Sequence, residues 1–216
     1  MRFSLKILLL LTALFAVTIA WLNARSVYLD AQHSSAANST LRATTIREKI
    51  GGNSYIRVDP NGDVRSLNVA GPEGYRALDK HTRAGETIEH LCIRSQYAFE
   101  HFRPKAFSSL TELYLADFQV DSVDLDQLSE SQSLSMLGLH TKGPPAIAVL
   151  STLPRDSPIR KIQILSTETG DISEFPFLPN LRSLVINVPS LQREQIDELR
   201  RKLPDCDIYY SDPRSP

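Results

Sequence analysis

One six-residue pattern recurs six times at nearly even spacing, and it constrains the fold more than any other feature of the chain. An apolar residue is followed by two residues of any type, then Leu or Ile, one further residue and a second apolar residue. Successive copies begin 24, 22, 24, 25 and 22 residues apart. The copies occupy residues 64–69, 88–93, 110–115, 134–139, 159–164 and 181–186. A fixed period of this length indicates stacked strand–turn units. The sequence therefore predicts an α/β fold, a solenoid in which these segments are parallel strands.

The segment before the first copy has the pattern of a capping β-hairpin. Residues 54–59 alternate between polar and apolar side chains, and Pro60-Asn61-Gly62 has the composition of a turn. The chain then returns as the first repeat strand. A cap is expected here because the terminal unit of a stack would otherwise expose its apolar core.

A helix and a last strand are expected at the carboxyl end. Residues 191–203 place apolar side chains on one helical face, with Ser190 as the predicted N-cap and Pro204 ending the helix. A strand is predicted over 206–210, which closes a repeat domain of residues 51–210. Residues 211–216 are predicted to be a loose tail.

The segments between the copies are expected to return along the opposite side and to add to the core. Their many prolines predict short helical turns or extended pieces. The core residues expected in these segments are Phe99, Phe102, Phe107, Val123, Leu125, Leu128, Ile147, Leu150, Leu153, Ile172, Phe175, Phe177 and Leu178.

The amino terminus has the pattern of a membrane anchor. Residues 1–6 include two basic side chains, and residues 7–22 contain no charge. Because a helix must cross roughly 30 Å of hydrocarbon, we expect a transmembrane signal anchor over 7–24, followed by a stalk helix over 25–50. Positive charge before the apolar run predicts that residues 1–6 are cytoplasmic and that the repeat domain lies outside the cytoplasm. A signal peptide that is cleaved on secretion is the alternative.

Charge and cysteine content exclude several classes of function. The chain has 24 basic and 25 acidic residues, so it lacks the basic excess of a nucleic-acid-binding protein. Its two cysteines, Cys92 and Cys206, lie on segments several strands apart, whereas a disulfide needs Cα atoms within about 7 Å. We therefore expect two free thiols, with Cys206 buried at the carboxyl end, and no metal or other cofactor.

The repeated pattern resembles the leucine-rich repeat family over residues 64–210. Together with the basic start, the membrane helix and the alanine-rich stalk, it is similar to small membrane-anchored leucine-rich repeat proteins of bacteria, notably of planctomycetes. The ending at 196–208 looks like a terminal repeat of that group. The resemblance implies a curved stack of parallel strands and a role in protein binding.

The chain departs from the family pattern after each strand. Family repeats place Asn or Cys three residues beyond the last strand leucine. The residues found there are Pro72, Gln96, Phe118, Lys142, Thr167 and Pro189. No asparagine ladder can form at this position, so we expect irregular turns.

The third and fifth residues of each copy are expected on the concave face, because side chains alternate along a strand. His90, Cys92, Glu112 and Tyr114 should adjoin there on neighbouring strands, with His140 near one edge. The candidate binding residues on this face are His90, Glu112, Tyr114, Met136, Lys161 and Gln163. Arg160, Lys161 and Arg182 are predicted to form a basic edge across the last two repeat strands.

A Cys–His pair can support nucleophilic chemistry, and Cys, His and Glu together can hold a transition metal. A polar, solvated strand face or a protein-contact patch is the simpler interpretation. We assign no catalytic residue and no metal ligand.

We predict a single-pass membrane protein, not an enzyme, that recognises an unidentified protein partner without covalent chemistry. An extended surface on a rigid scaffold favours this function. Two alternatives stay open. One is a structural component of the cell envelope that associates with copies of itself. The other is a thiol- or metal-dependent enzyme that uses Cys92, His90 and Glu112.

Overall fold

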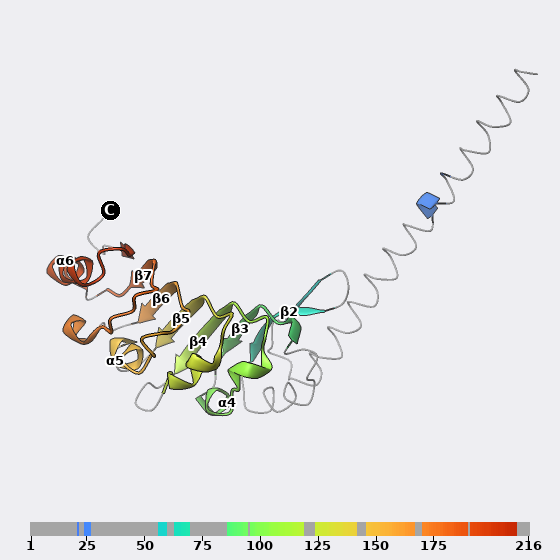
Figure 1. Ribbon diagram of the computed structural model, residues 1–216, viewed down its shortest axis with the longest axis horizontal. Helices are drawn as coiled ribbons and strands as arrows, with labels where there is room; N and C mark the ends of the chain where they lie inside the picture. The colour runs from blue at the N-terminus through green and yellow to red at the C-terminus, as the bar shows by residue number, and fades with distance from the viewer. Residues whose placement is uncertain are drawn as a thin grey trace, which may run out of the picture.

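The computed structural model describes residues 21, 24–26, 56–59, 63–69, 86–94, 96–118, 124–141, 146–166, 170–189 and 191–210. Within these residues the fold is α/β, and each strand of one eight-stranded sheet pairs with the next strand along the chain. Figure 1 shows the strands side by side in chain order. Helices α4 (Gln96–Glu100) and α5 (Ala146–Leu150) lie along one side of the row.

The strand bounds agree with the predicted repeats. They are β1 (Ile56–Val58), β2 (Val64–Val69), β3 (His90–Ile93), β4 (Glu112–Phe118), β5 (Met136–Thr141), β6 (Lys161–Ser166), β7 (Ser183–Asn187) and β8 (Asp207–Tyr210). Every pair from β2 to β8 is parallel, so the prediction of parallel strands is confirmed. β1 pairs antiparallel with β2, as predicted for the hairpin.

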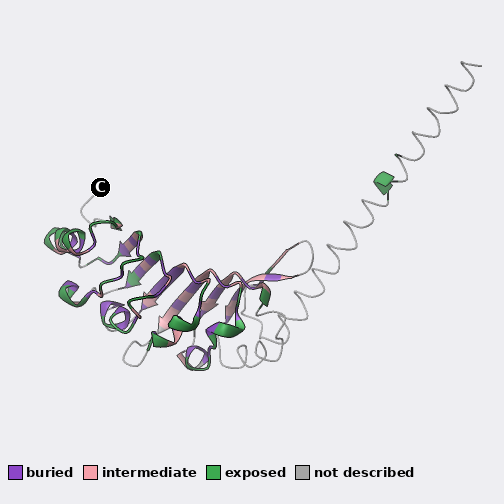
Figure 2. Cartoon of the chain, in the orientation of Figure 1, coloured by how far each residue is buried: buried purple, intermediate pink, exposed green. Residues whose placement is uncertain are grey.

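The register is the same from strand to strand. Each third residue pairs with the third residue of the next repeat, in the order Ser66, His90, Glu112, Met136, Lys161, Ser183 and Asp207. The fourth and sixth residues are apolar and buried throughout β2 to β7. Along the strands in Figure 2, buried and partly exposed residues alternate. This burial stabilises the stack, because each fully buried Leu or Ile contributes about 1.5–3 kcal/mol.

Where the structure describes them, the return segments contain short helical turns, one of the two forms predicted. Besides α4 and α5, they contain the 3-10 helices η1 (Pro104–Ala106), η3 (Asp126–Glu130) and η4 (Ile172–Glu174). Phe102 packs against Phe99 and Phe107, with ring centroids 6.1 and 5.2 Å apart.

One predicted core residue of the return segments is wrong. Phe177 is 61% exposed, because the core positions beside it are taken by Phe175 and Leu178, each 5% exposed. Two neighbouring residues of an extended segment cannot both point into the core. The prediction for Val123 lies outside the described residues.

Helix α6 (Arg193–Lys202) covers the carboxyl end of the core, with Ile196 and Leu199 fully buried. Its N-cap residue is Gln192, so the predicted cap at Ser190, which lies outside the described residues, is wrong. The backbone amide of Gln192 donates a hydrogen bond to Oε1 of Gln195 at 2.9 Å. This side-chain oxygen thereby satisfies a backbone donor at the start of the helix, as a capping residue does. Cys206 is a free thiol, as predicted, but it is partly exposed rather than buried.

Hydrogen bonds on the N-terminal side of the strands join successive repeats. The residue immediately before a repeat copy donates from its side chain to a backbone carbonyl of the preceding unit. The pairs are Thr87 to Val64, Ser109 to Glu86, Ser133 to Leu110 and Asn180 to Ser157, at 2.6 to 3.0 Å. The family pattern, which places its polar residue after the strand, did not predict this ladder of small polar side chains.

The predicted cytoplasmic start (1–6) and the tail (211–216) lie outside the described residues. The same is true of the predicted anchor (7–24) and stalk (25–50), apart from residues 21 and 24–26. In the part of the chain that the structure describes, no helix has both the length and the apolar character needed to cross a bilayer.

Candidate functional site

The candidate site is the face of the sheet formed by the third and fifth residues of the repeats, here called the open face. These side chains alternate with the buried fourth and sixth residues, so they point away from the core. Because the register is constant, residues from seven successive strands, β2 to β8, form two parallel rows. This regular spacing brings together side chains that are more than twenty residues apart in the sequence.

The first predicted contact on the open face joins β3 and β4, and it is an ion pair only when the His90 imidazole is protonated. His90 Nδ1 lies 2.9 Å from Glu112 Oε2, and the two side chains are 37% and 33% exposed. The prediction that these residues adjoin is therefore confirmed. Such a solvent-exposed pair contributes about 0–1 kcal/mol to stability. The contact with Glu112 holds the His90 imidazole at a defined place on the surface.

Tyr114, the next predicted binding residue, lies across the neighbouring strand. A Cβ atom at Gly138 of β5 would lie 2.7 Å from Cε1 of the Tyr114 ring, so the ring occupies the space that any larger side chain would need. The Tyr114 hydroxyl donates to Sδ of Met136 at 3.5 Å. Burial, followed by the negative charge of Glu112, raises the pKa of Tyr114.

Met136, a candidate binding residue predicted on this face, is buried in the structure. It is only 7% exposed, although it occupies a third position on the open face. Part of its surface is covered by Tyr114, whose hydroxyl contacts its sulfur. The alternation rule places the residue on the correct face, but it takes no account of large neighbours that cover it.

Cys92 of β3 pairs in register with Tyr114 of β4. Burial, the largest cause, and the charge of Asp117 raise the pKa of Cys92, whereas Arg94 lowers it. A raised pKa reduces the fraction of reactive thiolate. Among the described residues, no group of three His, Cys, Asp or Glu side chains is placed to hold a metal ion.

A second ion pair lies at the C-terminal ends of β3 and β4. Arg94 donates to Oδ2 of Asp117 from Nη2 at 2.6 Å and from Nε at 3.0 Å. Asp117 has a φ of 61°, and the pairing of β4 with β5 shifts register at this residue. Aspartate tolerates the left-handed conformation better than most residues do. The strand pattern did not predict this pair, because alternation along a strand gives no sign of a shift in register.

Lys161 and Gln163 continue the open face on β6, as predicted. Lys161 is exposed and pairs in register with Met136 and Ser183, whereas Gln163 is partly exposed and pairs with Gly138 and Val185. His140 lies in the row beyond the repeat pattern, where it pairs with Ala116 and Leu165. The six predicted residues therefore share one face, with Met136 covered.

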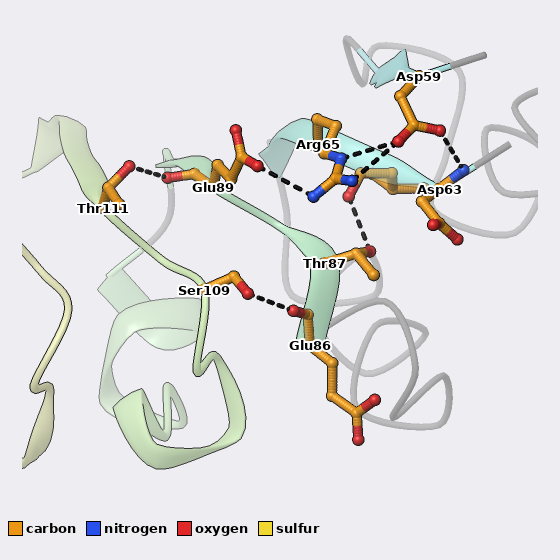
Figure 3. A network of polar contacts seen from close by, with 9 residues as sticks. Asp59, Asp63, Arg65, Glu86, Thr87, Glu89, Ser109 and Thr111 are labelled. Atoms are coloured by element: carbon orange, nitrogen blue, oxygen red, sulfur yellow. Dashed lines mark hydrogen bonds and ion pairs between the residues drawn. The ribbon is translucent and has the colours of Figure 1, made fainter. Parts of the chain in front are cut away.

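The hairpin end of the sheet carries a network of polar contacts centred on Arg65 (Figure 3). Arg65 of β2 contacts Asp59 Oδ2 at 2.9 Å through Nη2 and Glu89 Oε1 at 2.9 Å through Nη1. The hydrogen bond that Arg65 Nε donates to Asp59 Oδ2 is the largest cause that raises the pKa of Arg65. At this end of the sheet Arg65 is thus ion-paired with two carboxylates.

Comparison with known proteins identifies no relative: no family model matches the chain, and no curated protein and no solved structure matches it.

Proposed function

We propose that this chain is a leucine-rich repeat protein whose open face binds a protein partner non-covalently. The observation that carries the proposal is the constant parallel register of the repeat strands in chain order. A stack of this kind presents a broad, rigid surface, which suits recognition of another macromolecule.

The character of the open face supports binding rather than catalysis. His90 and Glu112 form a pair, and among the described residues no group of three His, Cys, Asp or Glu side chains is placed to hold a metal ion. The raised pKa of Cys92 leaves its thiol mostly protonated near neutral pH. A mixture of aromatic, charged and amide side chains on a flat scaffold is typical of protein-contact surfaces.

Attachment to a membrane is part of the same proposal. The uncharged run at 7–22 and the basic residues before it support an anchor with the repeat domain outside the cytoplasm. The open face would then meet proteins of the cell envelope. Cell fractionation and amino-terminal sequencing test this. A mature chain that begins near Trp21 or Arg25 and is recovered without membranes would contradict the anchor and support secretion.

Photo-crosslinking in intact cells tests binding at the open face. A photoreactive residue in place of Gln163 is expected to give a discrete adduct with a second protein, because Gln163 is partly exposed in the middle of β6. Tyr114 is less suitable, because its ring covers Gly138 and replacement would disturb the face itself.

The control is the same photoreactive residue in place of Ala148. This residue is exposed in α5, on the other side of the sheet. Adducts at Gln163 and not at Ala148 support the proposal. Equal adducts at both positions, or none at either, contradict binding by the open face, and adducts only between copies of this chain favour the structural alternative.

A further inference from the structure

At the second position of the repeat, one end of the sheet carries an ion pair, whereas the other carries two neighbouring arginines. The second residue of each copy lies just N-terminal to the open-face rows. In chain order these residues are Arg65, Glu89, Thr111, Ser135, Arg160 and Arg182. At the β2 end, Arg65 and Glu89 form an ion pair of 2.9 Å. At the β6 end, two arginines occupy the equivalent neighbouring positions.

Backbone hydrogen bonds establish that these positions are equivalent. The amide of Glu89 donates to the carbonyl of Arg65 at 2.9 Å, and the amide of Arg182 donates to the carbonyl of Arg160 at 2.8 Å. Arg160 and Arg182 are therefore neighbours across adjacent parallel strands, which lie about 4.8 Å apart. Both side chains are exposed, and so is Lys161, which follows Arg160.

Within the described part of the chain, these three cations have no carboxylate partner, in contrast to Arg65 at the other end of the sheet. Arg160, Lys161 and Arg182 form no ion pair with any carboxylate of the described residues, whereas Arg65, Arg94 and Lys105 each do. Arg182 uses Nη1 for the carbonyls of Pro179 and Leu181 at 3.1 and 3.2 Å. These bonds hold the guanidinium in place, and they leave Nε and Nη2 available to a ligand.

The residues beside this basic corner are suited to a polypeptide. Gln163 and Val185 pair in register next to Lys161 and Ser183, and Tyr209 of β8 pairs with Val185. Tyr209 is 58% exposed. An amide, an aliphatic and an aromatic side chain therefore lie next to the three cations. Asp207 lies nearby on β8, and its backbone amide, rather than an ion pair, joins it to Arg182.

We propose that the basic corner formed by Arg160, Lys161 and Arg182 is the docking point for an acidic segment of the protein partner. Carboxylates of that segment bind the two guanidinium groups and the Lys161 ammonium, and its apolar side chains pack on Val185 and Tyr209. Arginine suits this role because its planar donors match a carboxylate in two-point contacts. The assignment rests on the proposed function, since it names the partner's chemistry at the same face.

Fluorescence anisotropy with the full-length chain in neutral detergent tests the assignment. The probe is a short fluorescein-labelled peptide in which Glu alternates with Val, and the matched control peptide has Gln in place of Glu. The Glu peptide is expected to bind with a Kd that rises with salt, because exposed charges are screened. The double variant Arg160→Gln/Arg182→Gln should weaken binding about tenfold or more.

Arg193→Gln/Arg201→Gln is the matched control variant. It removes the same charge from exposed positions of α6 and should change the Kd less than about twofold. The variant Arg160→Lys/Arg182→Lys keeps the charge but loses the two-point geometry, so its affinity should be intermediate. Circular dichroism checks that all variants fold alike.

The outcomes separate the acidic-partner assignment from the proposed function. Equal affinity in the two glutamine variants, or no preference for Glu over Gln peptide, overturns the acidic-partner assignment. Binding to phosphatidylglycerol vesicles without binding to the peptide also overturns it and favours a lipid surface. Crosslinking at Gln163 does not depend on peptide affinity, so a specific adduct there would keep the proposed function even if the docking point is wrong.

Discussion

At the scale of single residues, one aromatic ring organises the centre of the open face. Tyr114 lies across Gly138 of the next strand and covers part of Met136. Glycine is required here because of close packing rather than unusual backbone geometry. The pair explains why the β5 part of the face is smooth and why Met136 is buried.

Replacement of Gly138 by Ala should therefore destabilise the chain. The added methyl overlaps the Tyr114 ring, and such overpacking costs about 1–3 kcal/mol. Urea unfolding followed by circular dichroism measures the change. In a Tyr114→Ala background, Gly138→Ala should cost much less, because the ring is gone. A Gly138→Ala chain as stable as the parent would contradict the proposed packing.

The two thiols are chemically quiet for the same reason, which is partial burial. Burial is the largest cause that raises the pKa of Cys92, and burial together with the charge of Asp207 raises the pKa of Cys206 to about 11. Arg182 acts in the opposite direction on Cys206. Neither residue has the lowered pKa of a nucleophilic cysteine.

The raised pKa of Cys206 predicts a loss of stability at alkaline pH. Unfolding restores a pKa near 9.0, so between about pH 9 and pH 11 the unfolded chain releases a thiol proton that the folded chain keeps. The stabilising effect is complete below this window and is lost as pH rises through it. The urea midpoint of the parent should fall more steeply across the window than that of Cys206→Ala. The two chains share every other ionisable group, so a difference in slope reports Cys206 alone. Equal slopes would contradict the effect.

At the scale of elements, the repeats are joined by side chains as well as by the strands themselves. At four junctions the residue before a copy donates a side-chain hydrogen bond to the preceding unit. At two copies the second residue also donates from its side chain: Thr111 to the Glu89 carbonyl and Ser135 to the Thr111 carbonyl. These bonds lie where the chain enters each strand.

Ser133→Ala should show what one such bond contributes. The hydroxyl donates to the Leu110 carbonyl at 2.9 Å in a partly buried site, and its loss should cost about 1 kcal/mol. Ser151→Ala is the control, because its hydroxyl bonds locally to Ala148 in an exposed turn and its loss should cost about 0.5 kcal/mol or less. Urea unfolding measures both variants. Equal effects would mean that the junction bond adds nothing specific.

At the scale of the whole molecule, the described stack is closed differently at its two ends. β1 adds an antiparallel strand at one end, and Arg65 there neutralises Asp59 and Glu89. At the other end α6 buries Ile196 and Leu199, and Lys202 donates to the Ile172 and Ser173 carbonyls of η4 at 3.2 and 2.5 Å. Charges are therefore paired near the hairpin, whereas those of Arg160 and Arg182 are left to solvent or a partner.

The sequence by itself determined the order, direction and register of the strands. A six-residue pattern with apolar fourth and sixth positions can bury these side chains in only one phase, and a one-residue slip would expose both of them. The same alternation placed His90, Glu112, Tyr114, Lys161 and Gln163 on one face. These features depend on local periodicity, which a single sequence displays directly.

Only the tertiary structure decided which side chains cover one another. Met136 is buried although it lies on the open face, and Phe177 is exposed although it was predicted in the core. Burial depends on neighbouring side chains and not on strand phase alone. The Arg94–Asp117 pair and the contrast between Arg65–Glu89 and Arg160–Arg182 likewise arise between residues 22 to 24 positions apart. The physical reason is that the repeat spacing predicts which positions are neighbours across strands, whereas side-chain conformations, and a register shift such as the one at Asp117, decide which side chains touch.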